Sequence, residues 1–205
     1  MGRNNPAELV ILVHGLWLNG IELRCLGRRL ERCGFSVCYF RYCSWRGTLE
    51  QAASALRRFL EQRKETRIHL VGHSLGGIVI ARMLEEGGPN NQGRIVLIGS
   101  PQMGSRLAAA LEGYRIGRFI LGPVAGEGIV RNRPAPPAGR ELLVIAGTLS
   151  FGFARFFGVT SPNDGTVAVA ETTVPGARQL LVRASHMGML FSRTAVADIC
   201  RFLAN

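Results

Sequence analysis

Short apolar runs alternate with segments of helical periodicity along most of the chain. Six runs predict strands over 8–14, 36–40, 67–72, 94–98, 141–146 and 179–182. Several are apolar almost throughout, as strands covered on both faces of a parallel sheet should be. Regularly spaced apolar residues predict helices between them, over 21–33, 48–65, 75–86 and 192–203. The alternation predicts an α/β fold: one domain over 1–205, with a mostly parallel sheet of about six strands and helices on both faces.

The segment 101–140 departs from this alternation. It carries a short helical pattern over 105–111, followed by Gly/Pro-rich sequence around 134–137. Connections this long are uncommon and are usually functional or mobile. Because this one leaves the carboxyl edge of the sheet, where ligands bind, it is a candidate for a small lid or substrate loop. The alternative is a peripheral helix followed by a linker.

The sharpest chemical signal is the sequence Gly-His-Ser-Leu-Gly-Gly at 72–77. It follows a predicted strand directly and opens a predicted helix, which is the context that a G-x-S-x-G nucleophile turn requires. Such a turn exposes the Ser74 hydroxyl at a helix N-terminus, where negative charge is favoured. Ser74 is therefore the candidate nucleophile.

A serine nucleophile needs a base that is held by a third group. Of the four histidines, only His186 lies in a loop after the last predicted strand. Of the two aspartates, Asp198 falls inside a predicted helix, whereas Asp164 lies in the loop Pro-Asn-Asp-Gly-Thr-Val at 162–167. The non-catalytic alternatives are that Asp164 belongs to an ordinary Asp-Gly turn and that His186 is a histidine of a surface loop. The order Ser74, Asp164, His186 is the one that this kind of fold requires, and it argues against both alternatives at once.

A developing oxyanion needs two backbone donors aimed at it. The N–H of Leu75, directly after the nucleophile, is one candidate. The N–H of Leu16 is the other, because Gly15 lets the loop after the first strand turn toward the site. His14 is expected to brace that loop by hydrogen bonding.

These motifs resemble the bacterial lipase and esterase branch of the α/β-hydrolase superfamily. The matching segments are His-Gly-Leu-Trp at 14–17, Gly-His-Ser-Leu-Gly-Gly at 72–77, Asn-Asp-Gly-Thr-Val at 163–167 and Ser-His at 185–186. The resemblance implies acyl-ester hydrolysis through an acyl-enzyme, with no cofactor. No metal is expected either, because no histidine lies among the four cysteines near the N-terminus and their spacings fit no zinc site. The chain has no room for the two antiparallel strands that usually come first or for a large helical cap, so a minimal, lightly covered sheet is implied.

Apolar residues crowd the loops that are expected to surround Ser74. Trp17, Met187 and Phe153 are the candidates to contact the acyl part of a substrate, since ligand pockets are mostly apolar. Further apolar positions in these loops are Phe151, Phe156, Phe157, Met189, Leu190 and Phe191. The alternative is that such side chains pack the core.

Five cysteines, an odd number with no C-x-x-C pair, are interpreted as free thiols of a cytosolic protein. A secreted enzyme with one or two disulfides is the alternative. The first apolar run is followed by the His-Gly-Leu-Trp motif at 14–17 and not by a small-residue cleavage site, so no signal peptide is expected. Together these observations predict a cytoplasmic location.

The net charge of +11 comes mainly from arginine, since Lys64 is the one lysine among 25 basic residues. A solvated basic surface is the simplest interpretation. Arginines in or near the long segment, at 115, 118, 131, 133 and 155, would also suit an anionic carrier protein or membrane surface. No nucleic-acid partner is expected, because the chain has no nucleic-acid-binding signature beside its charge.

Three classes of function remain open at this point. The first is hydrolysis of a small-molecule or lipid acyl ester, and the second is thioesterase or acyltransferase chemistry, including action on an acyl carrier protein. The third is a non-catalytic binding module on a hydrolase scaffold. Against the third stands the complete set Ser74, Asp164 and His186, which a degenerate scaffold would be expected to lose.

Overall fold

The computed structural model describes residues 8–65, 67–87, 93–131, 134–135, 140–151, 158–159 and 162–205. Its centre is a six-stranded sheet of order β2-β1-β3-β4-β5-β6, in which all neighbouring strands are parallel. The strands are β1 (Leu9–Val13), β2 (Ser36–Phe40), β3 (Ile68–His73), β4 (Ile95–Ile98), β5 (Leu142–Gly147) and β6 (Arg178–Val182). This confirms the predicted sheet, and each strand begins and ends within one residue of the prediction.

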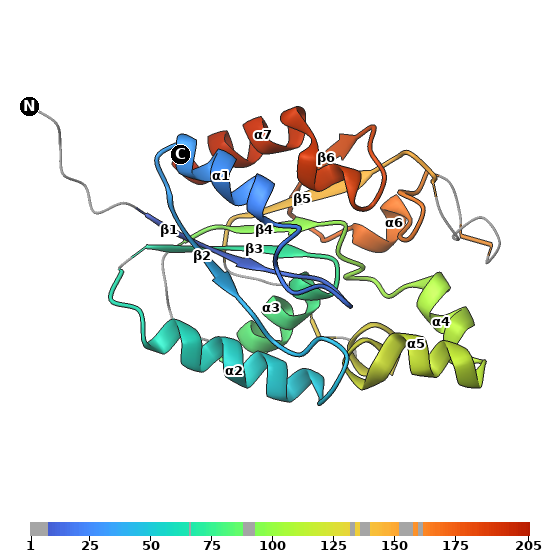
Figure 1. Ribbon diagram of the computed structural model, residues 1–205. Helices are drawn as coiled ribbons and strands as arrows, with labels where there is room; N and C mark the ends of the chain where they lie inside the picture. Colours follow the sequence, from blue (N-terminus) through green and yellow to red (C-terminus); the bar gives the residue numbers. More distant parts are fainter. Residues whose placement is uncertain are drawn as a thin grey trace, which may run out of the picture.

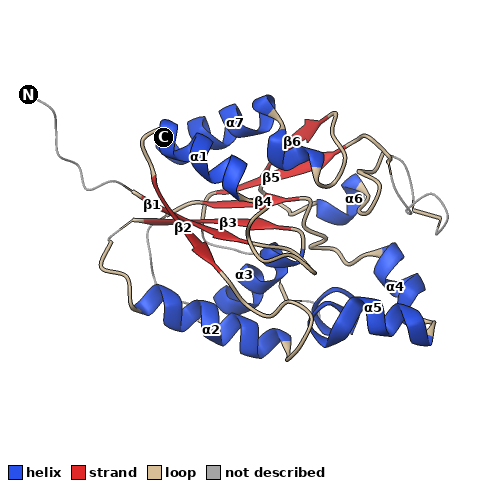
Figure 2. Cartoon of the chain, viewed as in Figure 1, coloured by secondary structure: helices blue, strands red, loops and turns tan. Residues whose placement is uncertain are grey.

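Helices cover the sheet on both faces, as predicted (Figures 1 and 2). On one face lie α1 (Arg24–Arg32) and α7 (Arg193–Ala204), and on the other lie α2 (Leu49–Glu61) and α3 (Leu75–Glu85). Side chains of β1 alternate between the two layers: Ile11 joins the core cluster under α2 and α3, whereas Leu12 joins the cluster under α1 and α7. Both are fully buried, which is why this strand is apolar without interruption.

The long connection after β4 contains more helix than its sequence predicts. The expected short helix is α4 (Arg106–Glu112), and it is followed by α5 (Arg115–Ala125) and the π-helical turn η1 (Gly126–Arg131). Figure 1 shows α4 and α5 at one end of the molecule, beyond the carboxyl ends of the central strands. Gly122 and Pro123 lie inside α5, and residues of these types normally indicate a turn. That is why sequence alone predicted a loop here.

Two shorter elements lie in the loops that carry the candidate acid and base. They are α6 (Val169–Thr172), after the loop of Asp164, and the 3-10 helix η3 (Gly188–Phe191), directly after His186. Both loops leave the sheet at the carboxyl ends of strands, where ligands bind in open parallel sheets.

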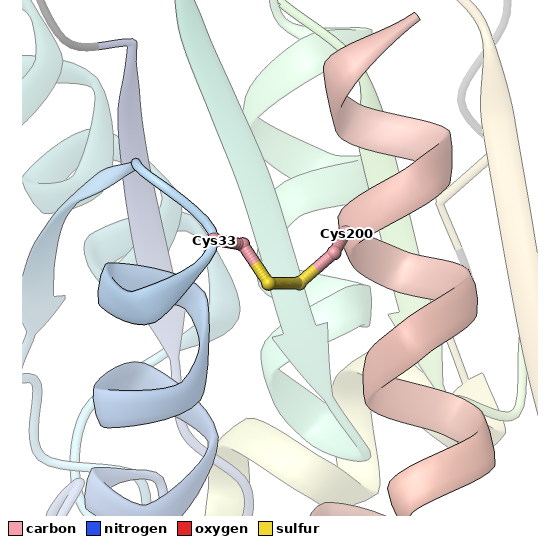
Figure 3. Close-up of a disulfide and its surroundings, with 2 residues drawn as sticks. All are labelled: Cys33 and Cys200. Carbon is pink, nitrogen blue, oxygen red and sulfur yellow. A yellow bond between two sulfur atoms is a disulfide. The ribbon is translucent and has the colours of Figure 1, made fainter.

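The interpretation of all five cysteines as free thiols is wrong. Cys33, at the end of α1, and Cys200, on α7, form a disulfide (Figure 3), with their Cα atoms 6.2 Å apart. The two helices lie side by side on one face of the sheet, although 167 residues separate the cysteines in sequence. Cys25, Cys38 and Cys43 are free.

The disulfide weakens the case for a cytoplasmic location, which was inferred partly from free thiols. Disulfides persist mainly in oxidising compartments and are rare in the cytosol of most organisms. Within the described ranges, no helix is long and apolar enough to cross a membrane.

Candidate active site

Ser74 stands on a tight turn between β3 and α3. Its backbone has φ 53° and ψ −122°, a strained conformation that persists only when the surrounding structure holds it. The turn is held by a hydrogen bond from the Ser74 N–H to the carbonyl of Ile98 at 2.9 Å. A β-carbon at Gly76 would lie 2.2 Å from the carbonyl oxygen of Val13, and one at Gly72 would lie 2.6 Å from a backbone nitrogen of α3. Both positions therefore require glycine.

His186 and Asp164 meet at the same edge of the sheet. The Nδ1 atom of His186 lies 2.7 Å from Oδ2 of Asp164. The backbone N–H of His186 also donates to the carbonyl of Asp164 at 2.9 Å. One bond thus holds the backbone of His186 and the other orients its ring, and a ring nitrogen engaged with a carboxylate leaves Nε2 as the position for proton transfer.

The loop of Asp164 is built to hold a carboxylate. The second carboxylate oxygen of Asp164, Oδ1, accepts hydrogen bonds from the backbone N–H groups of Thr166 at 2.9 Å and Val167 at 2.7 Å. The residue is 1% exposed. The two backbone donors on Oδ1 fix the orientation of the carboxylate, so that Oδ2 faces Nδ1 of His186.

Ser74 and His186 line one cavity of about 480 Å³ at the carboxyl edge of the sheet. Its volume falls within the range of about 300–1,000 Å³ of typical ligand pockets. The helices α4 and α5 and the turn η1 supply an apolar part of the cavity wall. The residues of these elements in the wall are Leu107, Ala108, Leu111, Ile120, Leu121 and Ile129.

The two candidate oxyanion donors also lie at this cavity. Leu16 and Leu75 both line it. Leu75 is the first residue of α3, and the first N–H groups of a helix have no partner within the helix. The loop of Leu16 passes close to the nucleophile, because a β-carbon at Gly15 would lie 3.1 Å from Cβ of Ser74. Both residues therefore lie at the same cavity as Ser74, and their role as oxyanion donors stays a prediction.

The other histidines near the site have structural contacts. His14 Nδ1 lies 2.9 Å from the carbonyl oxygen of Gly15, and its Nε2 accepts the backbone N–H of Tyr42 at 3.3 Å. These bonds brace the loop after β1, as expected. His73 is buried against the ring of His186, with centroids 4.9 Å apart. Burial, reinforced by the neighbouring His186, lowers the pKa of His73 to about 3, so this ring is neutral at ordinary pH.

The three residues expected to contact the substrate lie in different places, and their contact with a substrate stays a prediction. Trp17 lines the cavity. Met187 follows the base and is partly exposed, but the cavity wall does not include it, and Phe153 lies outside the described residues. The sequence analysis did not predict that α4 lines the cavity. The spacing of Leu107, Ala108 and Leu111 is nevertheless the apolar stripe of an amphipathic helix, whose apolar side packs against other parts of a protein.

Neither a cofactor nor a metal is expected from the sequence. In the part of the chain that the structure describes, no three His, Cys, Asp or Glu side chains gather as potential metal ligands.

Comparison with solved structures places this fold among esterases and other enzymes. A metagenomic carboxyl esterase, MGS0156, is 20% identical, with a TM-score of 0.71, over 89% of this chain and 65% of that one. An esterase from Exiguobacterium antarcticum is 14% identical, with a TM-score of 0.70, over 97% and 92%. A bromoperoxidase from Bacillus anthracis is 17% identical, with a TM-score of 0.71, over 97% and 92%. At these identities the likeness establishes the fold alone.

No curated protein sequence matches the chain. The sequence profile of the alpha/beta hydrolase family, by contrast, matches residues 10–199. The matched stretch includes the turn of Ser74, the loop of Asp164 and His186. With the parallel sheet and the turn at Ser74, this match shows that the chain belongs to the alpha/beta hydrolase family.

Proposed function

We propose that the protein is a serine hydrolase that cleaves carboxylic acyl esters through an acyl-enzyme. The observation that carries the proposal is the 2.7 Å contact between His186 Nδ1 and Asp164 Oδ2, in a site where His186 shares a cavity with Ser74. A histidine held in this way is oriented and its protonated form is stabilised, which is what a base for serine requires.

The chemistry proceeds in two halves. As Ser74 Oγ attacks the ester carbonyl carbon, His186 Nε2 takes the hydroxyl proton, and the carbonyl oxygen becomes an oxyanion that the N–H groups of Leu16 and Leu75 bind. The intermediate collapses, the bond to the alcohol breaks, and His186 gives its proton to the leaving oxygen. Water then attacks the acyl-enzyme with the same proton transfers and releases the acid and free Ser74.

The cavity supports an apolar acyl group as the part of the substrate that is recognised. Its wall from α4 and α5 is aliphatic, and its polar side chains are Ser74 and His186 together with Ser105 and Thr166. Thioesters and acyl transfer remain the second candidate, because the same three residues perform that chemistry on a different leaving group.

Hydrolysis of a series of p-nitrophenyl and thioester substrates tests the proposal. We expect turnover of oxygen esters with a preference for acyl chains longer than acetyl, and its loss in Ser74→Ala. A profile confined to thioesters would move the assignment to the second candidate. A folded wild-type protein that turns over neither class would favour the non-catalytic binding module.

We also propose that an anionic membrane surface presents the substrate. The support is an exposed apolar face at the start of α5, beside the cavity. It is formed by Tyr114, directly before the helix, and by Ile116 and Phe119, with exposed Arg115 and Arg118 between them. Apolar side chains that alternate with arginines suit the headgroup region of an anionic bilayer. Of the other arginines that suggested an anionic partner, Arg133 and Arg155 lie outside the described residues.

Sedimentation with phosphatidylglycerol vesicles and with phosphatidylcholine vesicles tests this second proposal. We expect binding to the anionic vesicles, weakened by salt and by Ile116→Glu. Leu181→Glu is the matched control, because Leu181 is also exposed but lies on β6. Equal loss in both variants, or salt-independent binding, would contradict docking through α5. Binding to an acidic carrier protein but not to vesicles would identify the other partner class.

A further inference from the structure

Helix α5 is broken near its end, and the break leaves a backbone carbonyl without its helical partner. Gly122 has φ 66° and ψ 170°, which lies outside the helical region. Pro123 follows and has no N–H, so it cannot donate to the carbonyl of Phe119 four residues earlier. Carbonyl groups at such a point need other donors.

Two tryptophan side chains supply donors at this break. The indole N–H of Trp45 donates to the carbonyl of Phe119 at 2.9 Å, and that of Trp17 donates to the carbonyl of Ile120 at 2.8 Å. A β-carbon at Gly122 would lie 2.7 Å from the carbonyl oxygen of Trp45, so glycine is needed for this close approach. The two indoles therefore hold the α5 segment in place over the cavity.

Trp17 differs from Trp45 because it belongs to the loop that carries a candidate oxyanion donor. It directly follows Leu16 and has φ 66°, which is rare and strained for a bulky residue. Its backbone N–H donates to Oγ of Ser44, which is buried, at 3.0 Å. Although the residue is 58% exposed, Trp17 is thus anchored by its backbone on one side and by its indole on the other.

We infer that Trp17 is a positioning residue that ties the oxyanion loop to α5 and thereby sets the direction of the Leu16 N–H. The inference rests on the proposed function and deepens it. A backbone donor points where the dihedral angles of its neighbours direct it, and a strained φ relaxes when the bonds that hold it are lost. By positioning this donor, the indole hydrogen bond to Ile120 stabilises the transition state, in which the oxyanion forms, more than it stabilises the bound ester.

The test compares Trp17→Phe with Trp45→Phe. Each substitution keeps an aromatic ring and removes one indole donor from adjacent carbonyls of α5, but only Trp17 lies on the oxyanion loop. With a short acetyl ester we expect Trp17→Phe to lower kcat and kcat/KM together by about 10-fold or more, since loss of a full oxyanion donor costs about 10²–10³-fold. We expect less than a threefold change in Trp45→Phe.

A second readout separates positioning from loss of packing. Affinity for a trifluoromethyl ketone, which forms an oxyanion on the serine, should fall in Trp17→Phe in parallel with kcat/KM. Ser44→Ala, which removes the other anchor, should act in the same direction. Equal kinetic losses in both tryptophan variants, or a change confined to KM, would overturn the inference. Absence of wild-type turnover would instead overturn the proposed function, so the two failures are distinguishable.

Discussion

Asp164 and His186 are joined twice, once between side chains at 2.7 Å and once from the backbone N–H of His186 to the carbonyl of Asp164 at 2.9 Å. The second bond places the histidine even when the carboxylate is changed. The side-chain bond alone decides which nitrogen of the ring carries its proton. The effects of position and of charge on this histidine can therefore be separated by experiment.

Asp164→Asn removes the charge while preserving the backbone bond. We expect kcat to fall by about 10³–10⁴-fold, because an amide at this position favours the wrong tautomer of the histidine and leaves its protonated form unstabilised. Steady-state kinetics measure this, and circular dichroism checks the fold. Asp198→Asn, on α7, is the matched control and should retain activity. Retention of more than a tenth of wild-type kcat in Asp164→Asn would contradict the assigned role.

Filling the cavity from α4 should shorten the acyl chains that are accepted. Ala108 is buried and lines the cavity, whereas Ala109, its neighbour on the same helix, is exposed. In Ala108→Phe we expect kcat/KM for octanoyl esters to fall about 10-fold or more relative to acetyl esters, because one or two lost methylene contacts already change discrimination that much. Ala109→Phe should leave the ratio unchanged. An unchanged ratio in Ala108→Phe would place the acyl group elsewhere.

The buried histidines predict how stability depends on pH. Burial lowers the pKa of His73 to about 3, below the ordinary value of 6.5, and burial also lowers the pKa values of His14 and His69. As the pH falls below 6.5, the unfolded chain binds a proton at His73 that the folded chain does not. Stability is therefore lost as pH falls from about 6.5 to about 3, by up to about 1.4 kcal/mol per pH unit for this group.

Nuclear magnetic resonance of the histidine rings measures this directly. The His73 ring signals should show no titration between pH 8 and pH 5, and urea midpoints should decline over the same range. A titration of His73 with a midpoint near 6.5 would contradict the buried, neutral ring.

The disulfide predicts the count of reactive thiols. Alkylation of the unfolded, unreduced protein should modify three cysteines, Cys25, Cys38 and Cys43, and prior reduction should raise the number to five. The double variant Cys33→Ser/Cys200→Ser should lose about 2–4 kcal/mol of unfolding free energy, since the bond closes a long loop. Its activity should persist because neither cysteine lines the cavity. Alkylation of all five without reduction would contradict the pairing.

The sheet and the three central site residues follow from local patterns. An apolar strand, a glycine-flanked serine and a helix are consecutive in sequence, so the turn at Ser74 is visible without coordinates. Asp164 and His186 could be selected because the chain offers so few alternatives of either type, and because parallel strands bring their following loops to one edge.

Features that depend on distant contacts were missed. The Cys33–Cys200 bond requires α1 and α7 to share a face of the sheet, which the spacing of the cysteines does not encode. Helix α5 contains Gly122 and Pro123, and it is completed by indole donors at Trp17 and Trp45, the first of which is 103 residues away from its acceptor. Local propensity predicts a loop there, and tertiary hydrogen bonds override it.

Covalent labelling with a fluorophosphonate, read by intact mass and peptide mapping, tests the central claim most directly. The account predicts one adduct, on Ser74, that is absent in Ser74→Ala and forms at least about 100-fold more slowly in His186→Ala, in line with the usual contribution of a general base. A folded wild-type protein that remains unlabelled, or an adduct on any other residue, would contradict it.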